Sequence, residues 1–213
     1  MKSLFGELYS IVVHMSSTST TRIRPTRGEA REAVLGATLE VIARHGLDAV
    51  THRRVAELAG VSPGSTTHHF ASRKDLIRAS FRHYMGIADG LLNRIDEELR
   101  ATVADPAERV RELLASLVEE EFADARLVRA EYEMILFAST DDELASFIRG
   151  WEARWIGFLA GYLEAAGAPR PVEAARILVN LTRGFELERL INRALDTEDF
   201  RRRIDPVLNA LVS

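Results

Sequence analysis

Hydrophobic positions recur at helical spacing along almost the whole chain. In the range 27–45, Val34, Ala37, Val41 and Ile42 follow one another at intervals that place them on one face of a helix. Similar spacing and capping signals predict further helices at about 52–59, 63–69, 72–102, 106–123, 125–138, 142–166, 172–195 and 198–211. No alternation typical of a β-strand stands out. The pattern therefore predicts an all-α fold of about nine helices.

The most informative helix boundaries lie within residues 51–76. Thr51 is suited to N-cap one short helix, and Gly60 suits the left-handed residue that ends it. Ser62 is suited to cap the next helix, whose first position is Pro63, where the missing N–H costs nothing. A helix, a glycine, a turn and a second helix of this size are typical of the motif that lays its second helix in the DNA major groove.

The order of these segments resembles the TetR-type transcriptional repressors. The resemblance covers about fifty residues and rests on VLGATLEVIARHG (34–46), VAELAGVS (55–62), GSTTHHF (64–70) and ASRKDL (71–76). The chain departs from the family at Thr67, where an aromatic residue is common, and at Thr66, often aliphatic. The resemblance implies a three-helix DNA-binding domain and a larger helical domain that binds a small molecule and dimerises.

Charge divides the chain in the same way. The net charge is −4, but residues 22–78 hold ten Arg or Lys and six Asp or Glu, which leaves the remainder with 18 basic and 26 acidic residues. A basic N-terminal part on an acidic body is typical of a protein that contacts DNA at one end. We therefore expect a flexible extension at 1–26, a helix-turn-helix DNA-binding domain at 27–71, and a helical ligand-binding and dimerisation domain at 72–213.

Polar and basic side chains around the second helix of the motif are the candidate DNA contacts. The predicted set is Thr51, His52, Arg53, Ser62, Gly64, Ser65, Thr66, Thr67, His68, His69, Arg73 and Lys74. Within it, Arg53 is the candidate for base recognition, whereas Arg73 and Lys74 are expected to bind phosphates. Helix capping alone is the alternative role of Thr51 and Ser62.

An arm before the first helix carries Arg22, Arg24 and Arg27. Arginines of this kind can enter the minor groove, and a solvated tail is the alternative. Residues 1–14 are either a short amphipathic extension or precede the natural start, because Met15 begins a more typical N-terminus.

The C-terminal part concentrates aromatic residues with a few charges. The resemblance implies a small-molecule pocket here, and aromatic walls with few polar groups suit such a site. Its predicted residues are Phe122, Glu131, Met134, Phe137, Trp151, Trp155, Phe158 and Arg183. Ordinary core packing is the alternative for each of them, and nothing in the pattern selects a ligand.

The last two predicted helices, 172–195 and 198–211, have broader apolar surfaces than a monomer's core requires, which favours a homodimer interface. The resemblance implies the same interface. Two DNA-binding motifs related by a two-fold axis would bind a palindromic operator in double-stranded DNA.

Several other classes of protein are disfavoured. The chain has no cysteine, no Gly-rich phosphate loop and no apolar run long enough to span a membrane, and the adjacent His68 and His69 point about 100° apart on a helix. We therefore expect no metal, no cofactor, no catalytic residue and a cytoplasmic location. The alternatives are an all-helical enzyme or small-molecule-binding protein, and a DNA-binding protein without a ligand.

Overall fold

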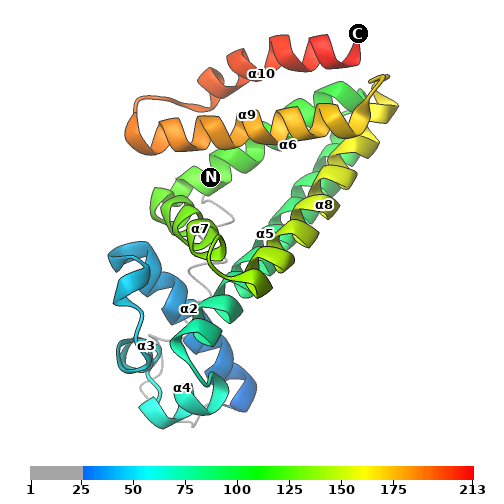
Figure 1. Cartoon of the computed structure of the whole chain (residues 1–213). Helices are drawn as coiled ribbons and strands as arrows, with labels where there is room; N and C mark the ends of the chain where they lie inside the picture. Colours follow the sequence, from blue (N-terminus) through cyan, green and yellow to red (C-terminus); the bar gives the residue numbers. More distant parts are fainter. Residues whose placement is uncertain (1–25) are drawn as a thin grey trace. The chain divides into compact units, whose positions relative to one another are not determined.

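A computed structural model describes residues 26–213, and every regular element in this range is helical (Figure 1). The α-helices are α2 (Arg27–His45), α3 (His52–Ala59), α4 (Pro63–His69), α5 (Arg73–Thr102), α6 (Pro106–Glu121), α7 (Ala125–Ala138), α8 (Asp142–Ala165), α9 (Pro171–Ile191) and α10 (Thr197–Val212). Two 3-10 segments, η1 (Leu47–Ala49) and η2 (Phe122–Asp124), connect them. The predicted all-helical fold is confirmed.

The predicted N-terminal extension lies outside the described residues, except for Thr26. The same holds for Arg22, Arg24 and the side chain of Arg27. Thr26 itself N-caps α2 and forms a capping box with Glu29, whose carboxylate accepts the Thr26 backbone N–H at 2.8 Å. This backbone hydrogen bond lowers the pKa of the Glu29 carboxyl. Helix α2 therefore begins where its capping signal lies in the sequence.

Helix α9 is shorter than predicted. It ends at Ile191, whereas the apolar pattern extends the helix to Leu195. At Asn192 the backbone leaves helical geometry, and the Asn192 side chain accepts a hydrogen bond from the backbone N–H of Ala194 at 3.3 Å. An asparagine side chain competes in this way with the next helical hydrogen bond, and the apolar period alone could not show it.

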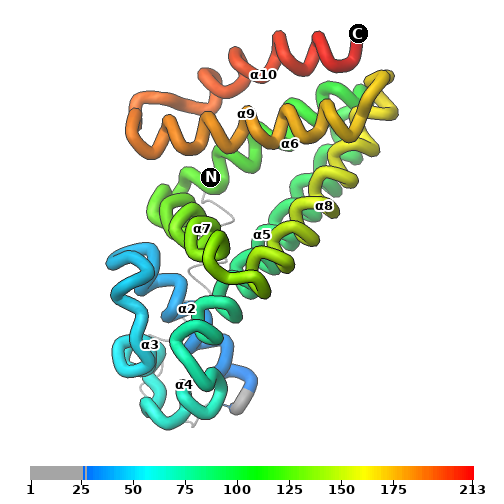
Figure 2. The backbone as a smooth tube through the Cα atoms, viewed as in Figure 1, coloured from blue at the N-terminus to red at the C-terminus, as the bar shows by residue number. Residues whose placement is uncertain are grey.

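The chain divides into two compact units, whose course Figure 2 follows by colour. Unit 1 contains the described residues up to Asp89 together with Ala123–Thr140, and unit 2 contains Gly90–Phe122 with Asp141–Ser213. Helix α5 therefore contributes to both units, and α7 belongs to unit 1 although α6 and α8, its neighbours in sequence, belong to unit 2.

The core of unit 1 forms where α2 packs on α3, α4 and α7. Its most deeply buried side chains are Val34, Leu35, Leu39, Ile42, Val55, Leu76, Ile77 and Phe81. Arg31 lies over the ring of buried Phe70, with its guanidinium carbon 5.7 Å from the ring centroid. This packing holds the two short helices α3 and α4, which are too short to be stable alone.

The core of unit 2 is formed by α6, α8, α9 and α10, with α8 and α9 in the most extensive contact. Phe185 of α9 and Phe200 of α10 lie 5.1 Å apart between ring centroids, and both are buried. Ion pairs between Arg111 and Asp205 and between Arg201 and Glu112 connect α6 to α10. Among the residues that the structure describes, no helix is both long and apolar enough to cross a membrane.

Candidate nucleic-acid interface

The turn between α3 and α4 depends on a residue in the left-handed region. Gly60 ends α3 with a φ of 67°, a conformation that side-chain-bearing residues rarely adopt. The Val61 backbone N–H returns to the Ala56 carbonyl at 3.0 Å, and the Ser62 hydroxyl accepts the backbone N–H of Ser65 at 3.2 Å. The chain thus leaves α3 and begins α4 within three residues, as in a helix-turn-helix motif.

Helix α4 has one buried and one exposed face. Thr66, fully buried, and the following Phe70 point into unit 1. The exposed face consists of two adjacent pairs, Pro63–Gly64 and Thr67–His68, which lie one helical turn apart and so share one side of the helix. This face is the surface of the motif that can enter a groove.

Thr66 is a correction to the predicted set of DNA contacts. Its hydroxyl donates to the Pro63 carbonyl at 2.8 Å, and none of the side chain is exposed. A hydroxyl on this helix was expected to reach DNA, but the turn of the helix places residue 66 on the core side. Thr66 therefore belongs to the core of unit 1.

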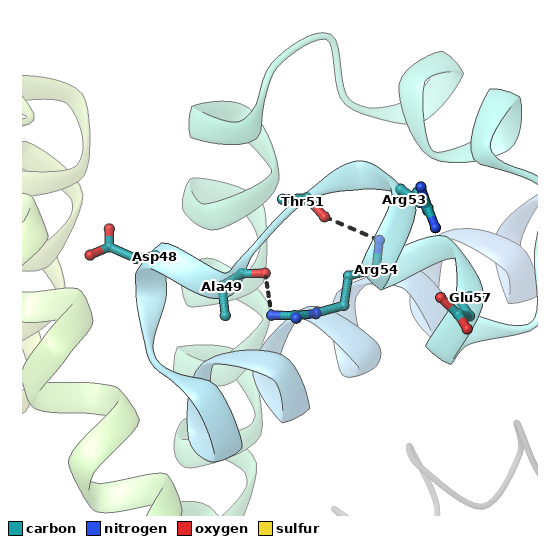
Figure 3. A pocket seen from close by; sticks show the side chains of 6 residues that line it. All are labelled: Asp48, Ala49, Thr51, Arg53, Arg54 and Glu57. Carbon is teal, nitrogen blue, oxygen red and sulfur yellow. Dashed lines mark hydrogen bonds between the residues drawn. The ribbon is translucent and has the colours of Figure 1, made fainter.

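The start of α3 borders a surface cavity of about 330 Å³, shown in Figure 3. It is lined by Asp48, Ala49, Thr51, Arg53, Arg54 and Glu57. The Thr51 hydroxyl accepts the Arg54 backbone N–H at 3.2 Å, so Thr51 is the N-cap of α3. The Arg54 guanidinium donates to the Ala49 carbonyl at 3.2 Å, while Arg53 lies apart from it and is exposed (Figure 3). A helix start with an arginine beside it suits a phosphate group.

Arg73, at the start of α5, is hydrogen-bonded to the segment that precedes α3. Its guanidinium donates to the carbonyls of Val50 at 3.0 Å and Leu47 at 2.6 Å. Both belong to the segment that leads into α3. Because two of its nitrogens donate to these carbonyls, Arg73 positions the start of α3. The sequence pattern did not predict this role. Lys74 follows it at the start of α5.

The neighbouring histidines of α4 lie against each other. The His68 and His69 rings meet edge to face with centroids 5.6 Å apart. Within the described part of the chain, no group of three or more His, Asp or Glu residues is arranged to hold a metal ion.

Helix α7 is fastened to the end of α2 and to η1 within unit 1. The Glu133 carboxylate accepts the Leu47 backbone N–H at 2.8 Å, and Arg129 donates to the Ala43 carbonyl at 2.9 Å. Gly46, with a φ of 81°, lies in the chain between Ala43 and Leu47. A Cβ at Gly46 would approach the Glu133 carboxylate to 3.2 Å. These contacts join residues 86 positions apart, which no local pattern could predict.

Two family models match the chain in agreement with this geometry. "Bacterial regulatory proteins, tetR family" matches residues 34–80, which contain α3, α4 and their turn. "Tetracyclin repressor-like, C-terminal domain" matches residues 105–213, just over half of the chain. The chain belongs to the TetR family of transcriptional regulators. This family consists of regulators with a DNA-binding helix-turn-helix, and its members are not enzymes.

Curated TetR relatives match over a part of their length. The regulator BetI of Pseudomonas paraeruginosa is 31% identical over 97 residues, 46% of each chain. The repressor KstR2 of Mycobacterium tuberculosis is 34% identical over 98 residues, 46% of this chain and 45% of the relative. The matched region thus spans a little under half of the length of these relatives.

Solved TetR-like structures match over most of the chain. A transcriptional regulator from Rhodococcus has a TM-score of 0.74 at 26% identity and covers 85% of this chain and 95% of its own. A regulator from Saccharomonospora viridis in complex with choline has a TM-score of 0.67 at 25% identity and covers 85% of this chain and 96% of its own.

Three of the predicted ligand residues of this TetR protein lie on α7, in unit 1. The Glu131 carboxylate accepts a hydrogen bond from the hydroxyl of buried Tyr84 at 2.8 Å. Met134 is fully buried, and Phe137 is half-buried. Met134 therefore belongs to the core of this unit, while Glu131 is held by a hydrogen bond from α5.

The remaining five lie in unit 2, most of them along α8. Trp155 stacks on Phe158 with centroids 5.6 Å apart, and Phe158 meets Tyr162 edge to face at 5.5 Å. Trp151 is half-buried on the same helix, one turn before Trp155. These half-buried rings form an aromatic stripe, which we define as Trp151, Trp155 and Phe158.

The two other predicted residues of unit 2 are engaged with charged partners. Arg183 donates to the Glu152 carboxylate at 2.7 Å, so α9 and α8 are joined by an ion pair. Phe122 carries the guanidinium of Arg189 over its ring at 4.3 Å.

Sequence reasoning missed two half-buried arginines in unit 2. Buried side-chain nitrogens of Arg94 and Arg189 have no hydrogen-bond partner among the described residues. Burial also lowers the pKa of the Arg189 guanidinium, against the opposing charges of Asp196 and Glu119. Buried donors of this kind are costly unless a partner satisfies them. The only signal in the sequence for these two residues is that each arginine lies among the apolar positions of its helix.

Proposed function

We propose that this TetR protein is a homodimeric repressor that binds a palindromic operator and leaves it when a small molecule enters unit 2. The observation that carries the proposal is the exposed face of α4 beside the capped start of α3. Both elements lie on one unit, with Arg53 exposed at the helix start. Such a protein would act in the cytoplasm, where bacterial DNA is found.

Exposed apolar residues on α9 support the dimer. Ile177, Leu187 and Ile191 are 46%, 46% and 90% exposed, and they lie on one side of the helix. Large apolar side chains so exposed on one helix face indicate a surface that another subunit covers. A two-fold axis through this face would pair two DNA-binding units and so favour an operator with two half-sites about 34 Å apart.

Two features support a small-molecule effector in unit 2. The aromatic stripe on α8 supplies apolar surface, and the buried guanidinium nitrogens of Arg94 and Arg189 supply unsatisfied donors. Apolar walls with a few polar groups are typical of small-molecule sites. The aromatic stripe, rather than the guanidinium donors, would suit a quaternary ammonium group, so choline, which is bound by the regulator from Saccharomonospora viridis, is a reasonable first probe.

The effector must bind the DNA-free conformation more tightly than the DNA-bound one, because otherwise it shifts no equilibrium. Helix α5 contributes to both units without interruption and is the element through which we expect the effector to act. The hydrogen bonds from α7 to the end of α2 would keep these two helices together when the effector acts on unit 1 through α5.

The DNA-binding test is a mobility-shift titration of the full chain with DNA flanking its own gene, over a series of salt concentrations. Arg53→Ala is compared with Arg149→Ala, an exposed arginine on α8 of unit 2. We expect the Arg53 variant to lose about tenfold or more in affinity and the Arg149 variant to match the wild type. Equal binding by both variants would contradict the proposed DNA face.

The effector test uses tryptophan fluorescence, because both tryptophans of the chain, Trp151 and Trp155, lie on α8. A probe such as choline that changes this fluorescence saturably should also release operator DNA over the same concentration range. Fluorescence saturation by a probe with DNA binding unchanged would exclude that probe as an effector. If every binding probe behaves so, the ligand-independent repressor becomes the better description.

A further inference from the structure

The exposed face of α4 is unusual in offering few hydrogen-bonding side chains. Pro63 has an apolar ring, Gly64 has no side chain, and Thr67 and His68 complete the face. Direct readout of bases in the major groove normally relies on Arg, Asn or Gln side chains, and none of these is present on α4. Recognition by this face must therefore use groups other than bidentate donors.

The hydroxyl of Thr67 is directed at its own helix. It donates to the Gly64 carbonyl at 3.1 Å and lies 3.4 Å from the Pro63 carbonyl. Phosphate oxygens only accept hydrogen bonds, so a hydroxyl whose proton is already used within the helix is poorly suited to bind one. Because the residue is exposed, its methyl group and the acceptor side of its hydroxyl oxygen are the parts that remain available to DNA, and of these the methyl group is the apolar one.

Gly64 is not required by the fold. A Cβ added there would meet only the Ser62 hydroxyl oxygen, at 3.9 Å, which is an ordinary contact. Glycine within a helix is less favourable than alanine, so Gly64 weakens α4 without relieving any crowding inside the protein. Its benefit is that the helix backbone can approach an external surface more closely at this point.

We infer that Thr67 recognises the 5-methyl group of a thymine base in the major groove, and that Gly64 allows the backbone of α4 to approach the DNA closely enough for this contact. The inference rests on the proposed DNA-binding function and adds the base that α4 recognises. A methyl–methyl contact of this kind distinguishes thymine from the other bases, because only thymine presents a methyl group in the groove.

The test starts with selection of binding sites by the full-length wild type from a random double-stranded library. Each thymine of the selected operator is then replaced in turn by deoxyuridine, which lacks only the 5-methyl group. We expect one position in each half-site to lose about fourfold in affinity on replacement, the value for one buried methyl group. Replacement in both half-sites should lose about fifteenfold, because the two effects multiply.

Two variants of Thr67 separate the methyl group from the hydroxyl. Thr67→Val keeps the shape and the methyl group and replaces the hydroxyl by a second methyl, and it should keep both the affinity and the sensitivity to deoxyuridine. Thr67→Ser keeps the hydroxyl and should bind thymine and deoxyuridine operators equally. Circular dichroism checks that both variants are folded. If Thr67→Val loses affinity while Thr67→Ser does not, the hydroxyl makes the contact and the inference is wrong.

Gly64→Ala tests the close approach, with Gly157→Ala on α8 as the matched control. A Cβ meets nothing within 4 Å at Gly157, so both substitutions fit the fold. Both variants should be at least as stable as the wild type, but only Gly64→Ala should lose about tenfold or more in operator affinity. Unchanged binding by Gly64→Ala would remove the close approach from the inference.

The outcomes also separate this inference from the proposed function. A wild type that selects no DNA sequence overturns both. A wild type that selects an operator and tolerates deoxyuridine at every position overturns the thymine contact alone.

Discussion

Glu40 is a carboxylate placed in the core of the DNA-binding unit. It is 2% exposed on α2, Arg44 forms an ion pair with one of its oxygens, and the other oxygen has no hydrogen-bond partner among the described residues. It borders a cavity of about 410 Å³ between α2 and α3, whose other walls include Val41 and Leu58. Burial raises the pKa of the Glu40 carboxyl, and the nearby charge of Arg126 opposes the rise. The charged form is therefore disfavoured by folding.

For single residues, we predict that substituting two glutamates of α2 changes the pH dependence of stability in opposite directions. The pKa of Glu40 in the folded state is raised above the ordinary value of 4.5, so the folded state keeps this proton at pH values where the unfolded state has lost it. The stability of the wild type therefore falls as pH rises from 4.5 to the raised pKa. Glu40→Gln removes this loss. Relative to the wild type, the variant should become more stable as pH rises from about 4 to 7, as measured by urea unfolding.

Glu29→Gln is the matched comparison. The pKa of Glu29 is lowered by its backbone hydrogen bond to Thr26, so its contribution to stability is present above 4.5 and lost as pH falls through the lowered value. This variant should lose stability at neutral pH and approach the wild type in acid. The same pH trend for both variants would contradict the assigned environments.

Helix α7 is the element whose position could not be expected from its place in the chain. It lies between α6 and α8 in sequence, yet it packs on α2 and η1 in unit 1. Arg129 satisfies the Ala43 carbonyl in the last turn of α2, where a helix leaves acceptors unpaired, and Glu133 accepts the Leu47 N–H at the start of η1, where a helix leaves donors unpaired. The segment leading into α3 is held by α7 through Glu133 and by α5 through Arg73.

At the element scale we predict that Glu133→Ala destabilises unit 1 by about 1–2 kcal/mol, because the half-buried Leu47 N–H loses its acceptor. Glu133→Gln keeps an oxygen at this position and should lose less. Urea unfolding and hydrogen exchange of the Leu47 amide measure the effect. Slow exchange at Leu47 in the alanine variant would show that Glu133 does not hold this segment.

The whole molecule combines two units of different character. One carries the short helices and the exposed face of α4, and the other carries the aromatic stripe and the exposed apolar side of α9. A two-fold dimer would let the second unit set the spacing of two copies of the first. Affinity for a palindromic operator would then depend on the exposed apolar side of α9, which is far in sequence from the helix-turn-helix.

At this scale we predict that Ile177→Glu combined with Leu187→Glu yields a monomer, because charge replaces two apolar side chains at the proposed interface. Light scattering should give half the mass of the wild-type particle, and operator affinity should fall at least a hundredfold when only one half-site can be bound. Arg149→Glu on α8 should change neither quantity. A double variant that stays dimeric would place the interface elsewhere.

Local signals in the sequence predicted most of the helices to within one or two residues. Thr51, Ser62 and Pro63 mark helix starts, and Gly60 marks an end, because capping and left-handed geometry depend on single residues and their nearest neighbours. The end of α9 was predicted four residues too late, since the apolar spacing continues past the point where Asn192 interrupts the backbone.

The all-helical class, the helix-turn-helix and the family could be predicted from the sequence, because they depend on periodicity, caps and a short ordered motif. Which side chains reach the surface of α4 depends instead on tertiary contacts. The tertiary structure buried Thr66, directed the Thr67 hydroxyl into the helix and engaged Arg73 with the carbonyls of Leu47 and Val50. It also assigned α7 to the DNA-binding unit. These outcomes depend on contacts between residues far apart in the chain, and such contacts leave no periodic pattern in the sequence.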